Sequence, residues 1–335
     1  MWILSIALSV CGAWLAEKVG WPLPWLIGPL LVMMAMRCAF GVLLPDVKGG
    51  RRFGQWIIAI SIGLHFTPEV LQAIMAHWLV VVVAAFLTTF ATVIGVLCLM
   101  RGGCDRTTAF FASLPGGASE MVNMALKHGA RVDQVAAAHS LRIVSIVLLV
   151  PPTFTLMLPA SAAATVQPVL IPQLLTVLVL GALTAVVWRY FKQPNPWMLG
   201  PLLFAAVYVA TTKTYMSVPP ELAKVAQLFI GLSLGSYFDR AFIRSALPFL
   251  SWVSVFIFLS IIFCWVLAWG LAWSSQIPTS ALILGMTPGG ITELSITAEA
   301  LGVPVALVTA VQVLRLLFVM FFASPVFNYW IKTNS

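Results

Sequence analysis

The stretch Ser113-Leu-Pro-Gly-Gly-Ala-Ser-Glu120 returns 173 residues later as Met286-Thr-Pro-Gly-Gly-Ile-Thr-Glu293. An arginine follows each copy, Arg142 after the first and Arg315 after the second. Proline lacks a backbone N–H and glycine tolerates unusual dihedral angles, so each copy is expected to interrupt a helix. Two further segments repeat at nearly the same spacing, 24–31 as 196–203 and 55–63 as 227–235. A duplication that carries matching helix breaks is typical of membrane transporters.

The composition indicates that the solvent around this chain is lipid. Of its 335 residues, 61% are hydrophobic and only 8% are charged, whereas about 25% are charged in a typical soluble domain. Apolar runs that could cross a bilayer occur at 2–16, 23–43, 53–74, 77–100, 134–158, 169–188, 197–212, 222–238, 247–273 and 303–330. We therefore expect an all-α integral membrane protein with ten spans.

The distribution of basic residues along the chain indicates its orientation in the membrane and does not indicate nucleic-acid binding. The net charge is +8, but the basic residues are dispersed between apolar runs and form no stripe, so no nucleic-acid partner is expected. If both Pro-Gly-Gly segments, 106–129 and 279–301, enter and leave the bilayer on one side, thirteen basic residues lie inside and three outside. If both segments cross, the same residues divide nine to seven. The positive-inside rule favours re-entrant hairpins, with both termini in the cytoplasm.

The number of membrane crossings in each half, odd or even, then sets the orientation of the second half relative to the first. Residues 1–165 form the first membrane repeat and residues 166–335 the second, each with five spans and one hairpin. An odd number of crossings inverts the second repeat, so the hairpin tips would enter from opposite faces of one integrated transmembrane unit. A weaker alternative keeps both segments as crossing broken helices and makes a short run such as 53–66 non-spanning.

The two tips are candidate solute-binding elements. Irregular backbone inside a bilayer is tolerated only against protein or a wet cavity. Helices that begin just after each Pro-Gly-Gly would present positive N-terminal ends to that cavity, which suits an anion. The candidate solute-binding residues, with the hydroxyls and arginines included, are Ser113, Pro115, Gly116, Gly117, Ser119, Arg142, Thr287, Pro288, Gly289, Gly290, Thr292 and Arg315.

Arg142 and Arg315 lie inside predicted spans, and a charged residue there is a functional hypothesis by default. A guanidinium group can hold a carboxylate or phosphate through two parallel hydrogen bonds. The alternative is a permanent ion pair with the nearby Glu120 or Glu293. Both alternatives stay open on sequence alone.

Three titratable residues are candidates for ion coupling. Glu120 and Glu293 could each cap the start of its own helix, or pair with an arginine. Alternatively, each could exchange a proton or Na⁺ during transport. His139 precedes Arg142 by about one turn and could titrate, although a buried histidine with satisfied hydrogen bonds is the commoner case.

No cofactor or metal site is expected. The five cysteines contain no Cys-x-x-Cys, and the four histidines show no ligand spacing. Copper or iron oxidation needs clustered ligands, so the sequence favours a protein that is not an enzyme.

The paired Pro-Gly-Gly-x-Ser/Thr-Glu segments, the two arginines and the Leu-x-Gly-Pro-Leu repeats resemble the AbrB-type duplicated bacterial inner-membrane proteins. The likeness spans essentially the whole chain. That family carries two labels, ammonia monooxygenase and membrane regulator of gene expression, and it is distantly similar to inverted-repeat secondary transporters. The resemblance therefore implies transport by analogy of fold.

These observations predict a multi-pass protein of the bacterial inner membrane that transports a small, anionic organic solute, with H⁺ or Na⁺ as candidate coupling ion. The expected partners are the solute and the lipid bilayer, and a homo-oligomer is left open. The alternative is a membrane sensor that influences gene expression without binding DNA.

Overall fold

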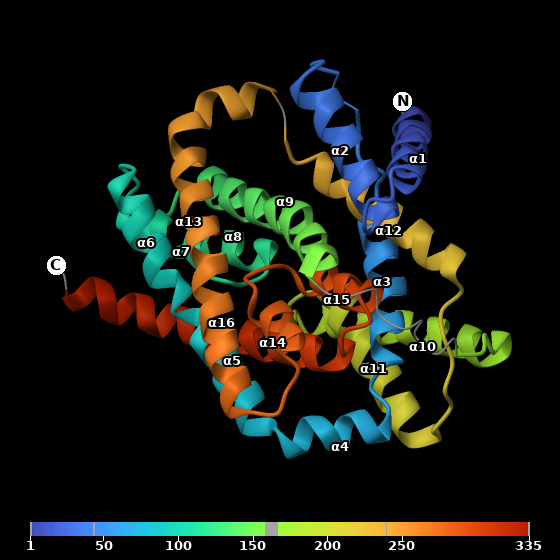
Figure 1. Ribbon diagram of the computed structural model, residues 1–335. Coiled ribbons are helices and arrows are strands. Elements are labelled where there is room, and N and C mark those ends of the chain that lie inside the picture. Colours follow the sequence, from blue (N-terminus) through green and yellow to red (C-terminus); the bar gives the residue numbers. More distant parts are fainter. Residues whose placement is uncertain (1, 43, 158–166, 239, 334–335) are drawn as a thin grey trace. The chain divides into compact units, whose positions relative to one another are not determined.

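The computed structural model describes residues 2–42, 44–157, 167–238 and 240–333, without the side chains of Ser119, 240–246 and 331–333. All regular secondary structure in these residues is α-helical, as the sequence predicted (Figure 1). The helices of the first half are α1 (Trp2–Lys18), α2 (Pro24–Cys38), α3 (Gly50–Gly63), α4 (Pro68–Ala76), α5 (Trp78–Thr89), α6 (Ala91–Arg101), α7 (Arg106–Ser113), α8 (Ala118–Lys127) and α9 (Val132–Met157). Those of the second half are α10 (Ile171–Tyr190), α11 (Pro196–Thr212), α12 (Pro220–Gly235), α13 (Arg240–Ser274), α14 (Thr279–Met286), α15 (Ile291–Ala300) and α16 (Val305–Thr333).

Five of the ten expected runs form helices that are long and apolar enough to cross a membrane, within the part of the chain described. They are Trp78–Arg101, Val132–Met157, Ile171–Tyr190, Leu247–Ser274 and Val305–Trp330. Helices α1, α2, α11 and α12 occupy four more runs, but they have only 15 to 17 residues. The chain thus has the helices of a multi-pass membrane protein.

The expected span over 53–74 contains a break that the sequence analysis did not predict. Helix α3 ends at Gly63, α4 begins at Pro68, and the two are bent by 80°. Proline disfavours helical conformation at the residue before it and has no N–H to continue the hydrogen-bond ladder, so a new helix begins there. Together they make one broken span or a re-entrant segment, which would be the sixth candidate.

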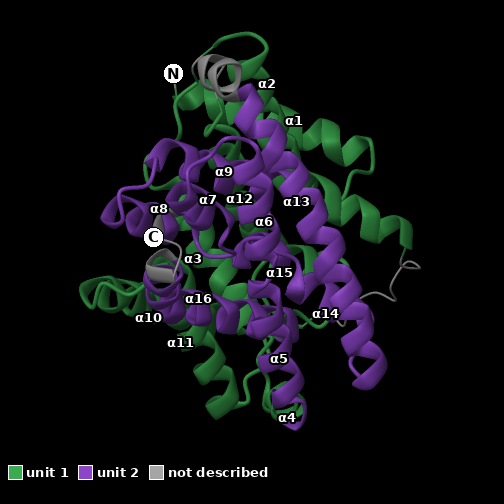
Figure 2. Cartoon of the chain, turned by 90° about the vertical axis from the view of Figure 1, so that its left-hand side faces the viewer, with its two compact units in different colours: residues 1–75, 147–245, 295–306 green, residues 76–146, 246–294, 307–335 purple. Residues whose placement is uncertain are grey.

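The chain divides into two compact units, shown in green and purple in Figure 2. Unit 1 contains Met1–Met75, Val147–Ser245 and Ser295–Ala306, and unit 2 contains Ala76–Ile146, Ala246–Leu294 and Leu307–Ser335. Each unit takes helices from both halves of the chain, so this division differs from the predicted repeats. The predicted repeat boundary, after residue 165, lies outside the described residues.

Unit 1 is held together by close helix crossings at small residues. Helix α2 contacts α1 and α12, and α11 contacts α10 and α3. The glycine of each Pro-Trp-x-x-Gly-Pro segment makes such a crossing: Gly28 lies against the backbone of Gly12, and Gly200 against that of Ala185. A Cβ atom at either glycine would collide with main chain. Small residues at these positions allow the helix backbones to pack closely.

Unit 2 contains the two Pro-Gly-Gly segments and both arginines. Helix α7 contacts α6 and α8, and α14 contacts α5. Aromatic rings fix α7 against α16, with Phe110 and Phe111 each about 5 Å from Phe327 between ring centroids. Gly95 lets α6 approach the end of α7 closely, because a Cβ atom there would meet Ser113.

Candidate functional site

Both Pro-Gly-Gly segments connect two helices through a short extended turn. Helix α7 ends at Ser113 and α8 begins at Ala118, while α14 ends at Met286 and α15 begins at Ile291. The residues before the prolines have nearly the same backbone angles, φ −58° and ψ 133° at Leu114, φ −56° and ψ 132° at Thr287. This extended conformation is the one that a following proline imposes. Each interruption between two helices therefore coincides with a Pro-Gly-Gly motif.

The second glycine of each motif makes room for a carboxylate. Gly117 has φ −66° and ψ 138°, which any residue can adopt, so the backbone alone does not require glycine. A Cβ atom at Gly117 would collide with Oε2 of Glu120, and one at Gly290 with Oε2 of Glu293. Each carboxylate thus folds back over the first turn of its own helix. This placement is that of a capping carboxylate near the positive helix end.

The two arginines reach the tips and donate to carbonyl oxygens there. Arg142 Nη1 donates to Leu114 O at 2.9 Å and Nη2 to Gly116 O at 3.3 Å. Arg315 makes the equivalent bonds, Nη1 to Thr287 O and Nη2 to Gly289 O, both at 2.8 Å. Helix breaks leave carbonyls without intrahelical partners, and these cations satisfy them. This tethering role was not among the predictions from the sequence.

His139 and Gln312 occupy equivalent positions on α9 and α16, and each binds the helix that leads into its Pro-Gly-Gly motif, α7 or α14. His139 Nε2 lies 3.0 Å from Phe111 O, and Gln312 Nε2 donates to Leu284 O at 3.2 Å. His139 Nδ1 lies 2.9 Å from Arg142 Nη2, which can only donate. Because a carbonyl only accepts, His139 must be neutral and protonated on Nε2. A second proton would remove the Arg142 contact, which weakens His139 as a coupling candidate.

Three buried polar atoms beside the tips have no hydrogen-bond partner among the described residues: Arg142 Nε, Arg315 Nε and Gln312 Oε1. Both arginines are only 2% exposed, and Gln312 is fully buried. In addition, a Cβ atom at Gly289 would lie 3.1 Å from Ile146, so the second tip packs on the helix that carries Arg142. The tips therefore hold two buried cations with unused donors.

The chain matches the model of a known protein family over most of its length. The model of the family described as "Transition state regulatory protein AbrB" matches residues 25–331. This chain belongs to the AbrB family. It is similar to "Putative regulator AbrB" of Escherichia coli (strain K12), with 28% identity over 340 residues that cover 99% of this chain and 95% of the relative. It is also similar to "Uncharacterized protein YhjN" of Bacillus subtilis (strain 168), with 29% identity over 359 residues, 96% of this chain and 91% of the relative.

In this AbrB-family protein the predicted hydroxyl donors are bound within the protein. Ser113 Oγ donates to Ala109 O of its own helix at 2.6 Å. Thr287 Oγ1 donates to Ile283 O and accepts from the indole N–H of Trp265. Thr292 is buried on the first turn of α15, and the side chain of Ser119 lies outside the described residues. Ser113 and Thr287 could serve a solute only as acceptors.

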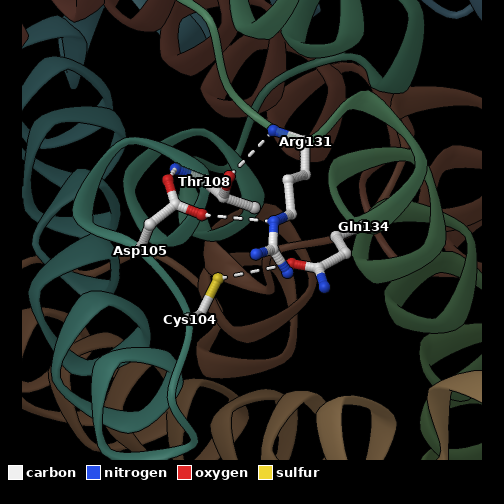
Figure 3. Close-up of polar contacts among 5 residues, drawn as sticks. All are labelled: Cys104, Asp105, Thr108, Arg131 and Gln134. Atoms are coloured by element: carbon white, nitrogen blue, oxygen red, sulfur yellow. Dashed lines mark hydrogen bonds and ion pairs between the residues drawn. The ribbon is translucent and has the colours of Figure 1, made fainter.

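A polar cluster that was not predicted from the sequence closes the base of the first hairpin (Figure 3). Asp105 caps α7 by accepting from the backbone N–H of Thr108 at 2.9 Å. The hydroxyl of Thr108 accepts from the backbone N–H of Arg131 at 2.9 Å, which joins the two ends of the hairpin. Cys104 adds a weak contact to Gln134. An aspartate three residues before the N–H that it caps was the available signal.

Proposed function

We propose that this chain is a secondary transporter of a small, anionic organic solute in the bacterial inner membrane, with both termini in the cytoplasm. The observation that carries the proposal is the pair of buried arginines beside two helix breaks, each with an Nε donor that no described residue accepts from. Buried charge is costly unless it is compensated, and an anion bound between the tips would supply that compensation. The solute-binding elements would be the tip residues Pro115 to Glu120 and Pro288 to Glu293.

An inverted duplication is supported by how the helices pair. Helix α2 contacts α12, and its counterpart α11 contacts α3, the counterpart of α12. In the same way, α1 with α2 corresponds to α10 with α11. Each of these helix contacts therefore recurs between the counterpart helices of the other half, as expected for two halves related by a pseudo-twofold axis. With the odd number of crossings expected from the charge distribution, this axis would place the tips on opposite approaches to one site.

The tip chemistry suits anion transport. The starts of α8 and α15 contribute positive helix ends, and the arginines contribute cationic donors. Glu120 and Glu293 fold back over the first turns of these helices and are the groups that H⁺ or Na⁺ would act on in coupling. Alternating access would come from the tip-bearing helices moving against the remaining spans. The proposal includes no catalytic step, no cofactor, no metal and no nucleic-acid partner; lipid and solute are the partners.

A membrane sensor is the second candidate. It is favoured by the description of the matching family as regulatory and by the regulator name of the Escherichia coli relative. A sensor would use the same anion site but move little solute.

Uptake by proteoliposomes distinguishes the two candidates. Purified wild-type protein would be tested with radiolabelled mono-, di- and tricarboxylates under proton and sodium gradients. We expect uptake by the wild type and loss of uptake for Arg315→Gln, with the exposed Arg52→Gln as control. Thermal unfolding in detergent would show whether Arg315→Gln still folds, and Arg315→Lys keeps the charge but loses the two-pronged geometry.

The outcome decides the function. Binding of a carboxylate without flux under any gradient would replace the transporter by the sensor. No binding of any carboxylate would overturn the anion site itself.

A further inference from the structure

The two halves of the chain differ at one buried polar position on the helices that carry the arginines, His139 in the first and Gln312 in the second. His139 on α9 uses both ring nitrogens, one with Phe111 O and one with Arg142. Gln312, its counterpart on α16, uses only its amide N–H, which donates to Leu284 O. The Gln312 Oε1 atom has no donor among the described residues, although the side chain is 0% exposed. The second half of the site therefore offers an acceptor that His139 does not offer in the first half.

This acceptor stands next to an unused donor. Gln312 and Arg315 are three residues apart on one helix, so their side chains lie on the same face. Both are tethered to the same short segment, Gln312 to Leu284 O, Arg315 to Thr287 O and Gly289 O. Within the described part of the chain, these bonds leave Gln312 Oε1 and Arg315 Nε unpaired. Buried polar groups left unpaired are costly, so a ligand that pairs both gains affinity.

The required ligand group must accept from Arg315 and donate to Gln312. A carboxylate alone only accepts, and it would leave Gln312 Oε1 unpaired. An ammonium beside a carboxylate could donate, but the buried charge of Arg315, three residues away on the same helix, would repel it. A neutral hydroxyl near the carboxylate meets both demands. A hydroxycarboxylate is the simplest such molecule.

We propose that Gln312 and Arg315 form a subsite for a hydroxycarboxylate, in which Arg315 Nε donates to the carboxylate and Gln312 Oε1 accepts from the hydroxyl. Gln312 is then the residue that sets specificity for the hydroxyl group. The inference rests on the proposed transport function, because it names the substrate class of that same site. Binding would be directional, since Gln312 on α16 supplies an acceptor for the hydroxyl and His139, its counterpart on α9, does not.

Matched acids test the subsite. Dissociation constants would be measured for pairs that differ by one hydroxyl: propionate and lactate, succinate and malate, tricarballylate and citrate. In every pair that binds wild type, we expect the hydroxy acid to bind roughly two- to tenfold more tightly, the net worth of one hydrogen bond. Equal affinity within the pairs that bind would overturn the subsite while leaving the anion site intact. If no acid binds, the proposed function fails instead.

A variant with histidine at position 312, the residue that the first half has at the equivalent position 139, gives a more specific test. Gln312→His would copy His139, with Nε2 donating to Leu284 O and Nδ1 accepting from Arg315. It leaves no acceptor for the hydroxyl, so malate should fall to the affinity of succinate while succinate is unchanged. Equal weakening of both acids would show that position 312 acts only through structure. Should Gln312→His fail to fold, Gln312→Met supplies a second variant without a hydrogen-bond acceptor of comparable strength.

Discussion

The contact between Gly117 and Glu120 gives a quantitative prediction about stability. The backbone at Gly117 has φ −66° and ψ 138°, so alanine can adopt it without strain. A methyl group there would nevertheless collide with Oε2 of Glu120, and the carboxylate must leave the start of α8. Losing a helix cap costs about 1 kcal/mol. Alanine is also a poorer residue than glycine before a helix, which adds a further cost of about 1 kcal/mol.

A double-mutant cycle isolates the contact. Gly117→Ala should cost about 2 kcal/mol in the wild type but only about 1 kcal/mol in Glu120→Ala, because the collision is then gone. The coupling of about 1 kcal/mol would be measured from unfolding free energies in mixed micelles. Gly270→Ala in α13 is the matched control, since nothing lies within 4 Å of the new methyl and alanine favours helix there. If the stability costs of Gly117→Ala and Glu120→Ala add to within about 0.3 kcal/mol in the double variant, the predicted collision is refuted.

Three more outcomes are expected. Gly231→Ala should destabilise the protein by about 1 to 3 kcal/mol, because the methyl would collide with Leu26 O across the α2 and α12 crossing, and unchanged unfolding would contradict that packing. Burial, and to a smaller extent the charge of Asp105, raises the pKa of the Cys104 thiol to about 11. In a variant whose only cysteine is Cys104, the thiolate fraction and the alkylation rate should therefore rise tenfold per pH unit up to about pH 11. A plateau of the alkylation rate near pH 9 would argue against this pKa. Ala130→Cys, at the base of the first hairpin, should react with an impermeant maleimide from the cytoplasmic side, and labelling only from outside would refute the re-entrant topology.

Local chemistry allowed the sequence to predict the helix breaks. Pro115 and Pro288 cannot continue a helix, so α7 and α14 end just before these motifs and α8 and α15 begin just after them. The break within the run 53–74 was not predicted because apolar composition does not show a bend. Thr67 and Pro68 were the usable signal, since threonine before proline is typical of a helix start.

The role of the arginines could not be read from the sequence. Arg142 binds carbonyls 26 and 28 residues earlier, and Arg315 does the same in the second half. These atoms come within hydrogen-bonding distance only in the folded chain, where α9 and α16 lie beside the tips. The recurrence of His139 with Arg142 and of Gln312 with Arg315, three residues apart each time, was the one pattern that pointed to a shared task. The two compact units could not be predicted from the sequence either, because each contains helices from both halves of the chain.

The arginine tether has a consequence for how this chain and its relatives vary. Each Pro-Gly-Gly exposes carbonyls that one distant arginine satisfies, so neither element is useful without the other. A relative in which one hairpin has become a continuous helix should also have lost the arginine on the helix that follows it. Conversely, loss of that arginine alone should be rare and accompanied by another donor at the same position. The break and its arginine should therefore be inherited as a linked pair, separately in each half of the gene.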